Sequence, residues 1–399
     1  MTRYGTPADV AFCTRCVMSN QRPSSTVERR NTGGPKTTLG FNADGVCAAC
    51  EYQEHIDHRI DWAARDAELR RLCDQHRSAD GSPDCIVPGS GGKDSWFAAC
   101  KLAEDYGMHP LTVTWAPMMW TDVGRRNYDR WSGRFPHVLM KRDEDTHRLL
   151  TRLAFLNLCN PFQPFVIGQR QCGARVSVET GVPLVFYGEN PAQYAGPVER
   201  NYESRMEPEF YRDEACEPIA LCIGGLDGNE LMRDHGLRER NLEPYCPVSR
   251  DAVASTGTDF RYLGYFLRWD PQEVYYYAQA RGFECNDRRT EGTFAKYASI
   301  DDKMDTLHYF STLQKFGIGR CMYDAAQEVR WGKITREEAV ALVRKYDGEF
   351  PTRDLVDCCM YMGVHLATVL IVLGEARAPH LWKYERNTWQ LRAPVWEAR

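Results

Sequence analysis

Residues 84–97 read DCIVPGSGGKDSWF, and this stretch decides the fold class. An apolar run leads into three glycines, and a helix-like run follows over residues 94–106. A strand, a glycine loop and a helix in this order predict an anion site, because the first amide groups of a helix lack partners within it and its dipole attracts negative charge. We therefore expect a phosphate group here, with a plain strand–helix turn as the alternative.

Strands and helices alternate on both sides of this loop. We expect strands at 84–87, 111–115, 137–140 and 183–187, and helices at 94–106, 121–133, 143–158 and 164–180. Such alternation favours a parallel sheet with helices on both faces, an α/β fold. After Gly188 the alternation breaks, and residues 191–260 look like an insertion.

The chain beyond the insertion is expected to return to regular structure. A strand resumes from Tyr262, and a helix starts near Asp270. The C-terminal part looks mostly helical, and Thr335 with Glu338 forms a capping-box signature. We divide the chain into a cysteine module (1–60), an α/β domain (61–270) and a mostly helical region (271–399).

Composition limits the function classes. The 399 residues are 43% hydrophobic and carry a net charge of −5, which gives no basic footprint for nucleic acid. The most apolar run, residues 364–373, is shorter than the ~20 residues that span a bilayer, so we expect a core helix and no membrane association. Sixteen cysteines without a secretory signal indicate a reducing cytoplasm with some thiols on metal.

Two C-x₂-C pairs begin the chain. They supply Cys13, Cys16, Cys47 and Cys50. Four thiolates suit tetrahedral zinc, and the absence of an open position favours a structural site. Four unrelated buried cysteines, or a redox or iron–sulfur site, are the alternatives.

The glycine loop itself differs from other nucleotide loops. It is not G-x-x-x-x-G-K-[ST], because Asp94 follows Lys93. Its backbone could approach a phosphate closely, Ser90 and Ser95 could donate hydroxyl groups, and Lys93 adds positive charge.

Residues 90–95, SGGKDS, resemble the signature of the PP-loop ATP pyrophosphatases. In that family the loop holds the pyrophosphate of ATP with Mg²⁺, and AMP is transferred to a carbonyl oxygen. The resemblance implies that ATP binds at the residues that match the fixed positions, which are Ser90, Gly91, Gly92, Asp94 and Ser95. Lys93 occupies the variable position, and we expect it to bind ATP as well and to be catalytic together with Asp94 and Ser95.

Two further segments are expected beside this site, because ligands of open α/β sheets bind at the carboxyl ends of strands. They are Thr114 with Trp115, and Gly188 with Glu189 and Asn190. Core packing of Trp115 and an ordinary turn at residues 188–190 are the alternatives.

Several blocks resemble the N-acetyl sugar amidotransferases of surface-polysaccharide biosynthesis. They are FCTRCVM, DGVCAAC, SGGKDS, PLVFYGEN, the late block from EGTFAKYASIDDK to LVRKYDG, and APHLWKYERNTWQLRAPVW. The resemblance implies ATP-dependent conversion of the acetamido group of a nucleotide-linked sugar or a nonulosonic acid into an acetamidino group. It also implies a partner glutaminase, similar to that of imidazole glycerol phosphate synthase, which supplies ammonia, and in some cases a cyclase-like barrel subunit.

Charged residues of the late block are candidates for substrate binding. They are Arg289, Glu291, Lys296, Asp301, Asp302 and Arg320. The cations suit a phosphate or carboxylate, and the acids suit Mg²⁺ or a sugar hydroxyl. A solvated, charge-paired helix face is the alternative. For the whole chain, a PP-loop sulfur transferase acting on tRNA or a small molecule, and a non-catalytic nucleotide-binding adaptor, also stay open.

Overall fold

A five-stranded parallel sheet forms the centre of the computed structural model, which describes residues 2–24, 27–188, 203–206 and 217–398. Its strand order is β3-β2-β1-β4-β7. The strands are β1 (Cys85–Pro88), β2 (Pro110–Trp115), β3 (His137–Met140), β4 (Leu184–Tyr187) and β7 (Asp259–Tyr262). Because the chain runs outward from β1 in both directions, the carboxyl end of β1 lies at the switch point where open α/β sheets bind ligands.

Helices cover both faces of the sheet, as predicted. Ile86 and Val185 belong to the hydrophobic cluster beneath α5 (Glu144–Leu158) and α6 (Gln163–Thr180). Val87 and Phe186 alternate with them and belong to the cluster on the opposite face. That second cluster is built with α2 (Trp62–His76), α3 (Lys93–Tyr106), α4 (Asp122–Ser132), α10 (Leu263–Phe266) and α11 (Pro271–Gln279). The fold is therefore the predicted α/β class.

The segment between β4 and β7 carries short elements. Its described residues form β5 (Cys222–Ile223), β6 (Leu226–Asp227), α7 (Gly228–His235), α8 (Glu239–Leu242), the 3₁₀ helix η4 (Glu243–Tyr245) and α9 (Arg250–Thr256). The predicted strand from Tyr262 is wrong, because β7 ends there and α10 follows. The Gly264 amide donates to Gly188 O at 2.9 Å, which turns the chain over the end of β4.

The C-terminal region is mostly helical, as predicted. It contains α12 (Asp305–Phe316), α13 (Arg320–Arg330), α14 (Arg336–Tyr346), α15 (Leu355–Met362), α16 (Leu366–Glu375), β8 (Trp382–Glu385), β9 (Thr388–Leu391) and the 3₁₀ helix η5 (Val395–Glu397). The capping box of Thr335 and Glu338 is present at the start of α14.

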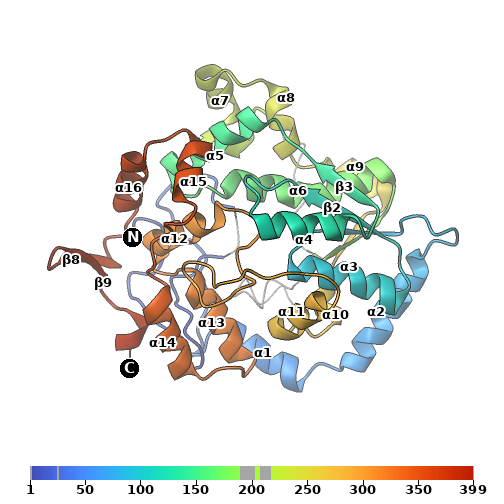
Figure 1. Cartoon of the computed structure of the whole chain (residues 1–399), viewed down its shortest axis with the longest axis horizontal. Coiled ribbons are helices and arrows are strands. Elements are labelled where there is room, and N and C mark those ends of the chain that lie inside the picture. Colours follow the sequence, from blue (N-terminus) through green and yellow to red (C-terminus); the bar gives the residue numbers. More distant parts are fainter. Residues whose placement is uncertain (1, 25–26, 189–202, 207–216, 399) are drawn as a thin grey trace.

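The apolar run at 364–373 does not form the expected core helix. In α16, Val369 and Leu373 are buried, whereas Leu366, Leu370 and Ile371 are 48%, 49% and 58% exposed. The helix lies at the edge of the molecule (Figure 1), so only one side of it meets the core.

The N-terminal cysteine module shares a hydrophobic core with the C-terminal helices. Val17 and Val46 pack in one cluster with Ile318, which lies between α12 and α13, and with Ala326 and other residues of α13 and α14. In Figure 1, α1 (Ala48–His58) lies near α13 and α14. The division at residues 60 and 270 stays a prediction.

None of the described helices is by itself long and apolar enough to cross a membrane. Only α15 and α16 together have the necessary length and composition, and they meet at an angle of 95°.

Candidate functional site

The glycine loop joins β1 to α3 at the switch point of the sheet. The Gly89 amide donates to Val113 O at 2.8 Å, and the Thr114 hydroxyl donates to Gly89 O at 2.6 Å. Gly91 has a φ of +87°, and a Cβ there would lie 2.8 Å from the Tyr128 backbone. Only glycine fits that position, so β2 and α4 hold the loop in one shape.

The side chains that follow the loop are fixed by hydrogen bonds. The Ser95 hydroxyl accepts from the Gly91 amide at 3.1 Å and donates to Gly92 O at 2.8 Å. Lys93 is buried, and its Nζ lies 2.7 Å from Asp94 Oδ1. The helix thus begins with an ordered turn beside one cation and one carboxylate.

Trp269, which sequence reasoning missed, also holds Asp94. Its Nε1 donates to Asp94 Oδ1 at 3.1 Å. It directly precedes Asp270, the N-cap of α11, and its contact with Asp94 spans 175 residues, which no local pattern in the sequence indicates. Lys93 and Trp269 together fix the orientation of the Asp94 carboxylate.

The segment before α12 folds back onto the glycine loop. The Ser90 hydroxyl donates to Asp301 Oδ2. Asp302 accepts from the amides of Met118 at 2.5 Å and Met304 at 2.9 Å. Burial raises the pKa of Asp301 to about 6 and that of Asp302 to about 7. The structure thereby brings two predicted site residues to the loop.

A cavity of about 360 Å³ separates the glycine loop from the helical region. Ser90, Gly92, Lys93 and Asp94 line one side. The facing acids are Asp301, Asp302, Asp305, Asp324 and Glu328. Carboxylate oxygens are the ligands that Mg²⁺ prefers, so this donor set suits a magnesium-bound phosphate chain.

Helix α13 contributes three charged residues to that wall at four-residue spacing. They are Arg320, Asp324 and Glu328. Arg320 Nε lies 3.0 Å from Asp324 Oδ1, and Gln272 Nε2 donates to Glu328 Oε2 at 2.6 Å. Burial raises the pKa of Glu328. Because residues four apart lie on one face of a helix, the predicted site residue Arg320 could have indicated in the sequence that Asp324 and Glu328 also belong to the site.

A larger cavity of about 1060 Å³ adjoins the first. Asp94, Arg320 and Asp324 line both cavities. The cations that line the larger one are Arg22, Arg29, Arg30, Lys36, Arg170 and Arg320. A second ligand in this cavity would therefore lie beside the end of the glycine loop.

Other predicted nucleotide contacts occupy different surroundings. Trp115 is buried in the core, and a Cβ on Gly168 would come within 2.2 Å of its ring. Thr114 directs its hydroxyl to the loop backbone. A Cβ on Gly188 would lie 3.9 Å from that of Asp94, so Gly188 is close to the loop. Residues 189–190, predicted as Glu189 and Asn190, lie outside the described residues.

Three predicted substrate residues line neither cavity. Arg289 pairs with Glu349 through two hydrogen bonds of 2.6 and 2.7 Å. Glu291 accepts from the Thr352 hydroxyl at 2.7 Å. Lys296 Nζ donates to a backbone carbonyl at 3.0 Å. The structure does not bring them to the glycine loop, and their binding of substrate stays a prediction.

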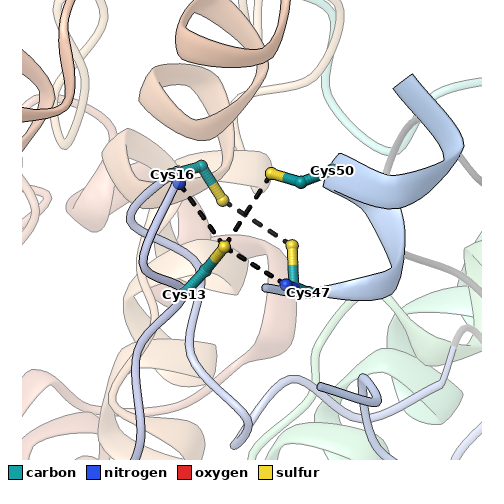
Figure 2. A group of neighbouring side chains, drawn as sticks. All are labelled: Cys13, Cys16, Cys47 and Cys50. Atoms are coloured by element: carbon teal, nitrogen blue, oxygen red, sulfur yellow. Dashed lines mark hydrogen bonds between the residues drawn. The ribbon is translucent and has the colours of Figure 1, made fainter. Parts of the chain in front are cut away.

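The four cysteines of the C-x₂-C pairs form one buried cluster (Figure 2). All four Sγ atoms lie within 4.8 Å of one another. Cys13 and Cys50 Sγ are 3.8 Å apart, and Cys16 and Cys47 Sγ are 3.7 Å apart. A tetrahedral zinc site with Zn–S bonds of about 2.3 Å has sulfur separations of about 3.8 Å. The cluster therefore fits a metal ion such as zinc.

Backbone amides also support thiolates in this cluster. The amides of Cys16 and Cys47 donate to Cys13 Sγ at 3.4 and 3.2 Å. Contacts with Cys16, and then with Cys47 and Cys50, lower the pKa of the Cys13 thiol. Arg336 donates to the carbonyls of Cys13 and Cys16, which ties the cluster to α14.

Residues 291–395 match the family model described as LPS biosynthesis protein WbpG-like, C-terminal domain. This match confirms, for that segment, the predicted resemblance to a family of surface-polysaccharide biosynthesis. A search among curated proteins found no match to the chain. The matched segment supplies Asp301, Asp305, Arg320, Asp324 and Glu328, which face the glycine loop.

Proposed function

We propose that this protein is an ATP-dependent amidotransferase of surface-polysaccharide biosynthesis. It converts the acetamido group of an N-acetylated sugar into an acetamidino group and releases AMP and pyrophosphate. The sugar is linked to a nucleotide or is a nonulosonic acid.

The observation that carries this proposal is the contact between two parts of the chain. The glycine loop resembles that of ATP pyrophosphatases, and the segment that matches an LPS biosynthesis family faces it across one cavity. The Ser90–Asp301 hydrogen bond joins the two. A nucleotide loop and a polysaccharide-biosynthesis segment that share one site support nucleotide-driven chemistry on a sugar.

The chemistry needs an activated carbonyl, because the oxygen of an amide is a poor leaving group. The acetamido oxygen attacks the α-phosphorus of ATP, and the bond to pyrophosphate breaks. Ammonia then attacks the imidate carbon, the bond to the AMP oxygen breaks, and a proton leaves the nitrogen. The helix N-terminus and Lys93 would stabilise the departing pyrophosphate, and the carboxylates opposite would hold Mg²⁺.

A separate glutaminase would supply the ammonia. Free ammonia is a small fraction of total ammonium at neutral pH, so direct delivery favours the reaction. A glutaminase needs an activated nucleophile beside a base. Burial raises the pKa of Cys172 to about 12 and raises that of Cys321 as well, which makes both thiols poor nucleophiles.

Mass spectrometry tests the proposal. Candidate acetamido sugars are incubated with the purified chain, ATP, Mg²⁺ and ammonium. The expected product is lighter by the difference between an oxygen atom and an NH group, and AMP accumulates with it. ATP cleavage to ADP, or no change in any acetamido sugar, would contradict the proposal.

The same assay separates the alternatives. Sulfide as the only effective nucleophile would indicate a sulfur transferase, and nucleotide binding without turnover would indicate an adaptor.

A further inference from the structure

The loop between the two cysteine pairs, residues 17–46, is described at 17–24 and 27–46, and these parts form a long arm fixed at the cysteine cluster. Its two sides pair with each other: the Ser24 amide donates to Thr37 O at 2.8 Å, and the Leu39 amide donates to Arg22 O at 2.9 Å. The Cys47 amide donates to Cys13 Sγ at 3.2 Å, which closes the base of the arm. A cluster that holds both ends thus sets the direction of the arm.

The tip of the arm is attached to the α/β part of the chain. Gln163 of α6 donates to Glu28 O at 3.1 Å. Arg29 donates to Cys222 O at 3.0 Å, and Arg30 lies 3.0 Å from Asp227 Oδ2. These contacts hold the tip across the space between α6 and the C-terminal helices.

The arm forms one wall of the larger cavity. Almost half of the described residues that line this cavity belong to the arm. Helices α6, α12 and α13 supply most of the opposite wall, and Asp94 of the glycine loop lies at its boundary. A ligand between these walls would reach the site where the carbonyl is activated.

The cations of the arm differ in the groups that they contact. Arg30 pairs with Asp227 and Glu230, and Lys36 pairs with Glu28. The hydrogen bond that the described residues give the Arg29 guanidinium goes to a neutral carbonyl.

Arg170 of α6 lines the same cavity as Arg29, from the wall opposite the arm. Burial first, and then the charge of Arg29, lower the pKa of Arg170. Both arginines line the larger cavity, and the guanidinium group of arginine matches carboxylate and phosphate geometry.

We infer that Arg29 of the arm and Arg170 of α6 together bind the negatively charged group of the acceptor. The arm between the metal-binding cysteine pairs then determines acceptor specificity, in addition to surrounding a structural metal. This inference rests on the proposed function, in which the acceptor is the N-acetylated sugar. The anion is a carboxylate or a diphosphate, which share the chemistry that two guanidinium groups recognise.

Calorimetric titration of the full chain tests the inference in the absence of ATP and ammonium. The probes are UDP-N-acetylglucosamine with a diphosphate, N-acetylglucosaminuronic acid with a carboxylate, and neutral N-acetylglucosamine. The variants are Arg29→Gln and Arg170→Gln. The control is Arg15→Gln, since Arg15 belongs to the same module, is exposed, pairs with Glu54 and lies outside the cavity lining.

The wild type should bind one of the anionic probes more tightly than the neutral sugar, and each variant should weaken that binding about ten- to hundredfold. The control should bind as the wild type does. The anionic probe that binds more weakly to the variants shows whether the two arginines bind a carboxylate or a diphosphate.

Equal binding of all probes by the wild type, or unchanged affinity in the Arg29→Gln variant, would overturn the inference. Arg29 is exposed, so its replacement should leave the fold intact even if that of Arg170 does not. Because binding is measured without turnover, these outcomes are independent of the proposed reaction. A chain that binds the probes but forms no AMP would refute the reaction alone.

Discussion

The Ser90 hydroxyl donates a hydrogen bond to Asp301, which lies 211 residues further along the chain. The other oxygen of the Asp301 carboxylate is buried and has no hydrogen-bond partner among the described residues. A buried carboxylate with an unsatisfied oxygen lowers stability unless a cation or proton meets it. This contact therefore connects the C-terminal segment to the glycine loop. A bound Mg²⁺ would satisfy the remaining oxygen of the Asp301 carboxylate.

We predict that Asp301→Asn changes the pH dependence of stability. The pKa of Asp301 is raised from 3.8 to about 6, so between these values the folded state binds more protons than the unfolded state. The free energy of unfolding therefore falls as pH rises through this window, by about 1 kcal/mol between pH values of roughly 5 and 7. Asn at this position should remove that contribution.

Urea denaturation without nucleotide or Mg²⁺ measures this difference. Each protein is unfolded at both pH values, and the change in stability is compared between wild type and variant. Equal changes in the two proteins would show that Asp301 is ionised in the folded state as easily as in the unfolded state.

We also predict that Asp94→Asn lowers the rate of AMP formation about a hundred- to a thousandfold, because the change removes the carboxylate that orients Lys93 and that could hold Mg²⁺ beside the phosphates. Lys93 and Trp269 fix this carboxylate beside both cavities. The measurement is chromatography of nucleotide products. The matched control is Asp105→Asn at the end of the same helix, where Asp105 pairs with Lys101 on the surface. Equal rates for the two variants would exclude a role for Asp94.

Helices and strands with strong local signals could be predicted from the sequence alone. The strand before the glycine loop is a continuous apolar run, the next strand alternates apolar residues with threonines, and the capping box at Thr335 follows a fixed spacing. The prediction of a strand from Tyr262 was wrong because an aromatic run can form either a strand or a short helix. Here the hydrogen bond between Gly264 and Gly188, a long-range contact, accompanies the short helix. The prediction of a core helix at residues 364–373 was wrong because the hydrophobicity of a helix alone does not say which of its sides meets the core.

The site was predicted less completely than the fold. The glycine loop and the cysteine pairs have spacings that constrain their chemistry, and the structure gathers each group. Arg289 and Arg320 look equivalent in the sequence, yet Arg289 pairs with Glu349 and Arg320 lines both cavities. Trp269 and the arm of residues 17–46 depend on long-range contacts, which no local pattern encodes.

Metal binding should depend on the cysteine cluster. We predict about one zinc ion per chain, and its loss in Cys47→Ser together with much lower stability, because metal binding and folding are coupled in such modules. Elemental analysis and thermal unfolding provide the measurements. Cys100→Ser is the control, since Cys100 is buried outside the cluster and its replacement should retain the metal. An iron–sulfur absorption spectrum would contradict zinc.

The choice of nitrogen donor tests whether the chain depends on a partner glutaminase. We predict that the isolated chain uses ammonium salts but not glutamine, and that glutamine supports turnover after a separate glutaminase is added. The physical reason is that the buried thiols of Cys172 and Cys321 have raised pKa values. AMP formation is compared with each donor. Glutamine-dependent turnover by the pure chain at its ammonium rate would indicate a glutaminase site of its own, and Cys216, which lies outside the described residues, would be tested first.

The ion pair of Glu28 and Lys315 should hold the arm in place. Lys315 is 1% exposed, and it also donates to Leu158 O at 2.8 Å. Although burial alone would raise the pKa of Glu28, Lys315 and Lys36 lower it, so the carboxylate is charged. We predict that Lys315→Met lowers the free energy of unfolding by about 3–5 kcal/mol, because it leaves a buried charge without its main partner. The double variant with Glu28→Gln should recover part of this loss, and urea denaturation measures both. If the single and double variants were equally destabilised, the loss would come from packing of the lysine side chain, and the ion pair would not be what anchors the arm.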